Sequence, residues 1–326
     1  MDTPLSLPPQ QIFAPLYGWE AFSISGPDRE KFVKGLVSNK VRGFSTGSGN
    51  PTLILSVKGR IITELLFLND EDRYLFLAPP KSLKHALHFF NHYHVIEDVT
   101  IQEEASLDTF VMAGEQLPDY LEKQALSMPA FVMTEGKEPK PEAGEGITFT
   151  TGDEQLWATR FALLGDVPML VGWGTKDASQ TAQAKLEADG FQRLSQAQWA
   201  QLQTEYKWYD AMSELRELLV HETGLQDSHV HFNKGCWVGQ EVVARTHYRG
   251  KANKGLFLLS SDDTSALEAG KKIVDAEGKE VGSLLARKER VDGSTVARAI
   301  LKLKSLEGDA SLFLEEGNIP LQTLKG

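Results

Sequence analysis

A chain of 326 residues and 36.1 kDa is too long for one ordinary hydrophobic core, so we expect two or three domains. Its content of 41% hydrophobic and 24% charged residues is ordinary for a globular protein and argues against disorder. The net charge of −11 gives a surface that repels phosphate backbones, which argues against DNA binding and against non-specific binding of any nucleic acid.

The cysteine content and the apolar segments limit the cellular compartments in which this protein is expected. The single cysteine, Cys236, excludes an intrachain disulfide and an iron–sulfur or zinc site made only of this chain's thiolates. Residues 1–11 lack the positive start and the apolar run of a signal peptide. The apolar stretch at residues 61–68 is interrupted and too short to cross a membrane. We therefore expect a cytoplasmic protein without a membrane partner or a resident metal.

The first hundred residues predict a compact α+β unit. Alternating and apolar runs predict strands at residues 22–25, 52–57, 61–68 and 74–78, and helices after Gly26-Pro27 and at residues 83–93. A Lys-Gly-Arg turn at residues 58–60 separates the second strand from the third and predicts a hairpin.

The remainder of the chain divides into two regions with different sequence patterns. A second unit starts near Leu107, with strands expected at residues 109–113, 157–164 and 169–171 and helices at 117–126, at 178–188 and from Ser195. Residues 134–146 contain two prolines and three glycines and predict an exposed loop. From Gly250 onward, short strands separated by turn signals predict a small β-barrel.

The strongest chemical signal surrounds Cys236. It lies between two glycines in the segment Lys-Gly-Cys-Trp-Val-Gly-Gln-Glu-Val-Val-Ala-Arg, which ends at Arg245. The run Gln-Glu-Val-Val-Ala-Arg from Gln240 is a good helix start, and we expect the helix to begin as early as Trp237. A helix start beside a cation such as Lys234 favours the reactive thiolate form of a cysteine. Glu241 is spaced to pair with Arg245 on one helix face. A buried, inert cysteine beside glycines needed for close packing is the alternative that spacing leaves open.

This segment, with His-Tyr-Arg-Gly after it, resembles the signature Lys-Gly-Cys-Tyr-x-Gly-Gln-Glu of the YgfZ family of folate-binding proteins. Residues 25–32, 35–39 and 58–60 also resemble blocks of that family, which is related to the aminomethyltransferase (T-protein) of the glycine cleavage system. The resemblance implies an α+β fold with three domains in a cloverleaf around a central folate channel, the last one a small β-barrel.

The same resemblance implies domain boundaries. A folate-binding domain is expected to be assembled from two separate segments, with another α+β domain between them and the barrel at the end. The expected ranges are 1–106 and 193–249 for the folate-binding domain, 107–192 for the second α+β domain and 250–326 for the barrel.

The resemblance further implies tetrahydrofolate or a derivative as cofactor and Cys236 as the catalytic position. By local alignment, Glu205 falls where the related enzymes carry a glutamate that accepts the adjacent N–H donors of the pterin. Aromatic walls and cations for the glutamate tail are also needed, and the candidates for these roles are Trp208, Lys234, Arg245 and Arg249. A solvated helix charge at Glu205 and ordinary core packing of Trp208 are the structural alternatives.

The chain departs from the family at several positions. Residues 205–209 lack the Gly and Pro of the family's Glu-Ala-Gly-x-Pro, residues 220–225 replace its Pro-Gln-x-x-Asn-Leu with Val-His-Glu-Thr-Gly-Leu, and Trp237 replaces a tyrosine. The aminomethyltransferases carry an Asp-Asp pair that activates the folate where this chain has Thr63 and Glu64. Because threonine cannot act as a carboxylate base, we do not expect glycine-cleavage chemistry, and strand phase leaves the direction of Glu64 open.

We therefore expect a folate-binding accessory protein, not a complete enzyme, that supports tRNA modification and iron–sulfur enzymes such as radical tRNA thiolases. With one thiol, it would need a partner or a thiol cofactor to hold a cluster. Two alternatives stay open: a tetrahydrofolate-dependent one-carbon transferase that uses Glu64 or Cys236, and a tRNA-binding adaptor that uses the basic run from Arg245 to Lys254.

Overall fold

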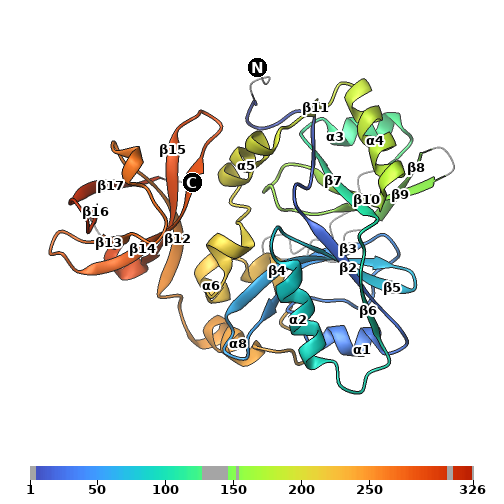
Figure 1. Cartoon of the computed structure of the whole chain (residues 1–326), viewed down its shortest axis with the longest axis horizontal. Coiled ribbons are helices and arrows are strands. Elements are labelled where there is room, and N and C mark those ends of the chain that lie inside the picture. The colour runs from blue at the N-terminus through green and yellow to red at the C-terminus, as the bar shows by residue number, and fades with distance from the viewer. Residues whose placement is uncertain (1–4, 127–145, 152–153, 307–310, 325–326) are drawn as a thin grey trace.

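The computed structural model describes residues 5–126, 146–151, 154–306 and 311–324. In these residues, helices pack against two open β-sheets, and a closed barrel of six strands lies to one side of them (Figure 1). The α+β class and the C-terminal β-barrel expected from the sequence are confirmed. The expected loop at 134–146 lies outside the described residues, except for Gly146, which begins a strand.

The first sheet has five strands in the order β3-β4-β5-β2-β6. Their bounds are β2 Glu20–Ser25, β3 Gly49–Leu55, β4 Ile61–Asp70, β5 Arg73–Ala78 and β6 Thr100–Glu103. Helices α1 (Arg29–Lys34) and α2 (Leu83–Tyr93) cover one face and bury an aromatic cluster against it. The hairpin of β3 and β4 forms as predicted, and β4 is buried on both faces over most of its length, including the polar residues Thr63 and Glu64.

The second sheet has six strands in the order β11-β1-β7-β10-β9-β8. Their bounds are β1 Ile12–Pro15, β7 Leu107–Ala113, β8 Gly146–Thr151, β9 Glu154–Arg160, β10 Met169–Thr175 and β11 Gln192–Arg193. Helices α3 (Leu117–Lys123) and α4 (Lys176–Ala188) cover its outer face. The strand β1, which the sequence did not predict, pairs antiparallel with β7, so a segment near the N-terminus belongs to this sheet.

The two sheets share one hydrophobic core. Leucines of β4 and β5 pack there against β7 and β10, and the helix α5 (Gln196–Glu205) closes one side. Ser195 begins α5 as predicted, through a capping box in which Ser195 and Gln198 satisfy each other's backbone N–H groups. The first sheet, the second sheet and α5 therefore contact one another in this core.

A connecting segment runs from α5 to the barrel between the sheets and the barrel wall (Figure 1). Its elements are the π-helix η1 Ala211–Leu215, and the helices α6 Val220–Thr223, α7 Gln226–His229 and α8 Gln240–Arg249. The barrel follows, with strands β12 Lys254–Ser260, β13 Lys272–Val274, β14 Glu280–Glu289, β15 Thr295–Lys302, β16 Leu312–Leu314 and β17 Ile319–Leu324. It also contains the 3-10 turns η2 Thr264–Ala266 and η3 Leu303–Leu306.

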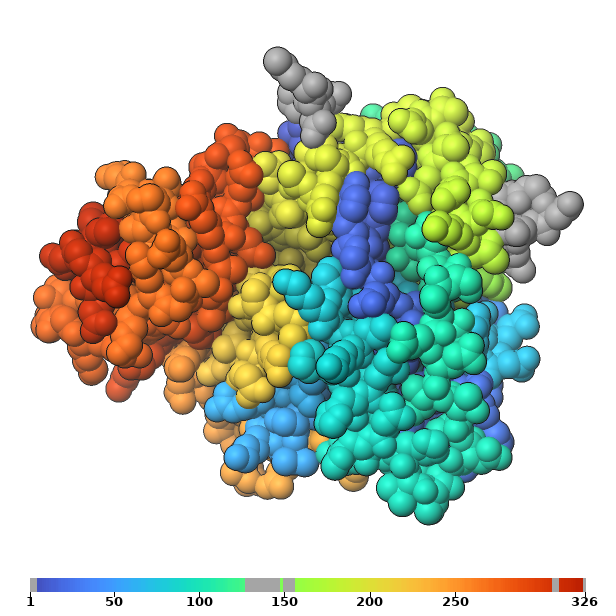
Figure 2. All heavy atoms as spheres, in the orientation of Figure 1, coloured from blue at the N-terminus to red at the C-terminus, as the bar shows by residue number. Residues whose placement is uncertain are grey.

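Buried charges join the barrel to the connecting segment. Arg298 Nε of β15 donates to Glu214 Oε1 of η1 at 3.0 Å, and Lys288 Nζ of β14 lies 2.9 Å from Glu214 Oε2. The side chains of Glu214 and Arg298 are only 1% and 2% exposed. The Arg298 guanidinium also lies 4.9 Å from the centre of the Tyr209 ring. Figure 2 shows the barrel surface closely packed against this part of the chain.

We expect Glu214→Gln to lower the free energy of unfolding by about 3–5 kcal/mol, because it leaves the buried charge of Arg298 without its partner. Chemical denaturation measures this change. The control is Glu241→Gln, which removes an exposed carboxylate from its pair with Arg245 and should leave the stability close to that of the wild type. Equal, small effects of the two substitutions would contradict the account of this junction.

Candidate functional site

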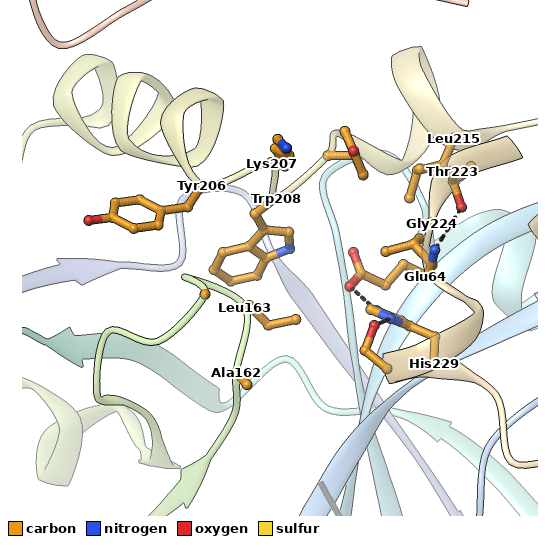
Figure 3. A pocket seen from close by; sticks show the side chains of 14 residues that line it. Glu64, Ala162, Leu163, Tyr206, Lys207, Trp208, Leu215, Thr223, Gly224 and His229 are labelled. Carbon is orange, nitrogen blue, oxygen red and sulfur yellow. Dashed lines mark hydrogen bonds and ion pairs between the residues drawn. The ribbon is translucent and has the colours of Figure 1, made fainter. Parts of the chain in front are cut away.

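A pocket of about 380 Å³ lies where the first sheet, the turn after β9 and the connecting segment meet (Figure 3). The first sheet contributes a carboxylate, the turn contributes apolar atoms, and the connecting segment contributes aromatic and polar groups. The residues that define these walls are Glu64, Leu163, Trp208, Tyr209, Ser228 and His229. They come from segments that are far apart in the sequence.

The phase of β4 places Glu64 in the pocket. Successive side chains of a strand point to opposite faces, and Leu65 lies in the aromatic core under α1 and α2. Thr63 shares that face, where its hydroxyl donates to Ser82 Oγ at 2.8 Å at the start of α2. Glu64 therefore points the other way, toward the second sheet and the pocket, which answers the question that the sequence left open.

Glu64 is paired with a histidine that the sequence analysis did not single out. His229 Nε2 lies 2.8 Å from Glu64 Oε1, and both side chains are 2% exposed. On the other side of the ring, His229 Nδ1 lies 2.7 Å from Ser228 Oγ. Figure 3 shows the pair of Glu64 and His229 at one end of the pocket.

The segment between α1 and β3 fixes the backbone of α7, which carries the histidine. Ser38 Oγ donates to the carbonyl of His229 at 2.6 Å, and Asn39 Nδ2 donates to the carbonyl of Ser228 at 3.1 Å. Both donors lie in the block at 35–39 that resembles the YgfZ family. Their physical role is to hold α7, and with it His229, against the sheet.

Trp208 forms the aromatic wall of the pocket. The side chain is 5% exposed and packs edge-on against Trp199 and Trp19, with ring centres 5.4 and 5.8 Å away. Lys207 adopts a positive φ of 57°, which turns the chain after α5 and aims Trp208 inward. Beside it, burial raises the pKa of Tyr209, so this phenol stays protonated at neutral pH. The role of Trp208 in cofactor binding stays a prediction.

Glu205, the expected pterin ligand, is engaged elsewhere. Arg290 donates to its two oxygens, from Nε to Oε1 at 3.0 Å and from Nη2 to Oε2 at 2.8 Å. The backbone N–H of Val291 donates to Oε1 at 3.1 Å. Glu205 does not line the pocket beside Trp208. Its assignment to the pterin stays a prediction. In the structure, Glu205 joins α5 to the barrel through its ion pair with Arg290.

Cys236 is exposed and lies four residues before α8. The helix start expected as early as Trp237 is wrong, and the helix predicted in the run from Gln240 is confirmed as α8. Gly239 precedes it with a positive φ of 84°, and a Cβ at this position would lie 2.7 Å from the carbonyl of Ser56. The glycine thus allows the loop that carries the thiol to pack directly on the β3–β4 turn.

Lys234 points into the protein. Its Nζ donates to the carbonyls of Lys34 and Val37, both at 2.6 Å, and so ties the loop of Cys236 to the end of α1. Burial lowers the pKa of Lys234 to about 7, and the positive charge of Lys34 adds to the shift. Two carbonyl acceptors suit a neutral amine, which has two N–H groups to donate.

The two expected arginines lie on the exposed surface of α8. Arg245 Nη2 donates to Glu241 Oε1 at 2.7 Å, which confirms the pair predicted from their spacing. Neither Arg245 nor Arg249 lines the pocket beside Trp208. Of the expected site residues, the structure therefore brings Trp208 to the pocket and leaves Cys236 and both arginines outside its lining.

No protein-family model matches the chain. Curated relatives do match over nearly its whole length. The "tRNA-modifying protein YgfZ" of Colwellia psychrerythraea is 24% identical over 302 residues, which cover 90% of this chain and 86% of the relative. The protein of the same name from Escherichia fergusonii is 25% identical over 289 residues, 87% of this chain and 83% of the relative. The resemblance to the YgfZ family is confirmed.

The similarity to YgfZ proteins agrees with the comparison of folds. The glycine cleavage system aminomethyltransferase T of Bartonella henselae matches with a TM-score of 0.75 and 13% identity, covering 97% of this chain and 85% of that one. At this identity, the match shows a shared fold. Within the described ranges, no helix is long and apolar enough to span a membrane, and no group of three or more His, Cys, Asp or Glu side chains could hold a metal.

The lowered pKa of Lys234 predicts a pH-dependent stability. Between about pH 7 and the ordinary lysine value of 10.5, the unfolded chain binds this proton and the folded chain has released it. The free energy of unfolding should therefore rise with pH in this window, by at most about 1.4 kcal/mol per pH unit from this group. Denaturation of the wild type and Lys234→Met at pH 7 and pH 9 measures the difference. Parallel pH profiles would show that Lys234 stays ionised in the fold.

Proposed function

We propose that this protein binds tetrahydrofolate or a derivative in the pocket beside Trp208 and supports tRNA modification in the cytoplasm. The observation that carries the proposal is the pairing of an aromatic wall with the buried carboxylate of Glu64 in one pocket. A pterin requires an aromatic face for its ring and a carboxylate for its N–H donors. The volume of about 380 Å³ lies within the usual range of small-molecule sites.

The signature around Cys236 and the similarity to proteins named tRNA-modifying YgfZ support the connection to tRNA. We propose that the protein acts on iron–sulfur enzymes, such as radical tRNA thiolases, and that Cys236 contributes its exposed thiol to them. A single thiolate cannot hold a cluster, so the partner enzyme or a thiol cofactor supplies the other ligands. We propose domains at the boundaries expected from the sequence, except that β1 belongs with the second sheet, and a folate bound between them.

A one-carbon transferase is the second candidate, and the position of Glu64 favours it. A carboxylate and an imidazole 2.8 Å apart in a ligand pocket could exchange a proton with a bound folate. Thr63 cannot assist, because its hydroxyl faces α2. Turnover of methylene-tetrahydrofolate by the purified protein would distinguish this candidate from an accessory role.

Calorimetric titration with tetrahydrofolate tests the proposed site. Trp208→Leu should raise the Kd at least about tenfold, because it removes the aromatic face that the ring would stack on. Trp199→Leu is the matched control, since this buried tryptophan contacts Trp208 but does not line the pocket. Equal affinities in the two variants would contradict the site. Salt-sensitive binding of tRNA, without binding of tetrahydrofolate, would support a tRNA adaptor instead.

The proposed role of Cys236 predicts a separation of binding from function. Cys236→Ser changes one exposed atom, so the variant should keep the stability and the tetrahydrofolate affinity of the wild type. In cells that lack the protein, it should fail to restore the level of thiolated tRNA that the wild type restores. Full restoration by Cys236→Ser would remove Cys236 from the function.

A further inference from the structure

The two glutamates that could bind a ring in this region differ in their hydrogen bonds. Both oxygens of Glu205 already accept, from the Arg290 guanidinium and from the Val291 backbone, as described above. The Glu205 side chain is 11% exposed and that of Arg290 is 33% exposed, so this pair is largely shielded from water. A ligand that takes Glu205 competes with Arg290 for the same carboxylate, and displacing Arg290 would leave a partly buried cation without its acceptor.

Glu64 has the opposite arrangement. Its Oε1 accepts from His229, whereas Oε2 accepts no hydrogen bond from any residue that the structure describes. The side chain is 2% exposed and lines the pocket, and Figure 3 shows the carboxylate between His229 and Trp208. Burying a carboxylate oxygen is costly unless a donor reaches it. The pocket thus contains a hydrogen-bond acceptor, Glu64 Oε2, to which a ligand can donate.

His229 determines where that acceptor lies. We assign the donor of the 2.8 Å bond to His229 Nε2, because a carboxylate oxygen accepts hydrogen bonds. With this tautomer the Ser228 hydroxyl can donate to Nδ1 at 2.7 Å, so each ring nitrogen has a hydrogen-bond partner. Because the ring is held at both ends and its backbone is held by Ser38, it cannot turn away from Glu64.

We infer that Glu64, positioned by His229, is the carboxylate that binds the folate ring, and that Glu205 is a structural residue. The inference rests on the proposed function and names the ligand chemistry of the same pocket. The group that fits is a planar heterocycle that donates N–H to Glu64 Oε2 and lies against the face of Trp208. His229 acts through Glu64 and does not itself need to touch the ligand.

Calorimetric titrations with two probes test this assignment. Tetrahydrofolate carries the ring, whereas p-aminobenzoylglutamate carries the tail without it. Glu64→Gln should raise the Kd for tetrahydrofolate by about tenfold or more and leave the Kd for p-aminobenzoylglutamate unchanged. Glu205→Gln is the matched control and should change the affinity for tetrahydrofolate by less than about threefold.

Two substitutions of His229 test whether it positions Glu64 through a hydrogen bond or only fills space beside it. Gln can donate an N–H to Glu64, and Leu fills a similar space without a donor. His229→Gln should therefore retain more tetrahydrofolate affinity than His229→Leu, whereas a histidine that only packs would give both the same loss. Thermal unfolding of each variant without ligand shows that it is folded, and this pair also tests the inference if Glu64→Gln does not fold.

The outcomes separate this inference from the proposed function. Wild-type affinity in Glu64→Gln, or a loss confined to Glu205→Gln, overturns the inference and leaves the folate site in place. Equal losses in the two His229 variants overturn the positioning role. If the wild type binds p-aminobenzoylglutamate but gains nothing from the ring of tetrahydrofolate, the role of Glu64 is overturned as well. Absence of tetrahydrofolate binding by the wild type removes the proposed function, and with it this inference.

Discussion

The pocket depends on the buried carboxylate of Glu214. The stretch between α5 and α6 carries Trp208 and Tyr209, which form one wall of the pocket, and only its end, at residues 217–219, bonds to the first sheet. Glu214 holds this stretch by pairing with Arg298 and Lys288 of the barrel. Buried ion pairs add little net stability once desolvation is included, so their use here is best understood as fixing position. The barrel therefore contributes to the pocket without lining it.

The opposite wall is fixed by different means. Glu64 is placed by strand phase, since β4 is buried on both faces and every second side chain points toward the second sheet. His229 lies 165 residues away in the sequence and is held by hydrogen bonds to Ser38, close to α1. A conformationally restrained acceptor thus faces a restrained aromatic ring. Such preorganisation lowers the conformational entropy that the protein loses when these two side chains engage a ligand.

Local patterns in the sequence predicted much of the fold. The helix expected at 83–93 has those bounds in α2, and the hairpin, the capped start of α5 and the barrel also form. These features depend on periodicity, capping and turn residues close together in the chain. The strand β1 was missed because four residues carry too little periodicity, and its partner β7 lies about a hundred residues away.

The site was less predictable than the fold, because its residues act through distant partners. The sequence near Glu205 contains no sign that Arg290, 85 residues later, would engage its carboxylate. His229 lies in a short helix without an apolar repeat, so no local pattern separates it from the other histidines. Lys234 was expected to face a ligand, but two backbone carbonyls near α1 draw it inward. Recognition of the motif identified the segment and could not supply these contacts.

A crystal structure of the protein with bound tetrahydrofolate tests the central claim most directly. The account predicts that the ring lies against Trp208, with a ring nitrogen about 2.7–3.2 Å from Glu64 Oε2 and Glu205 still paired with Arg290. A ring bound to Glu205 with Arg290 displaced, or a folate bound away from this pocket, would contradict it.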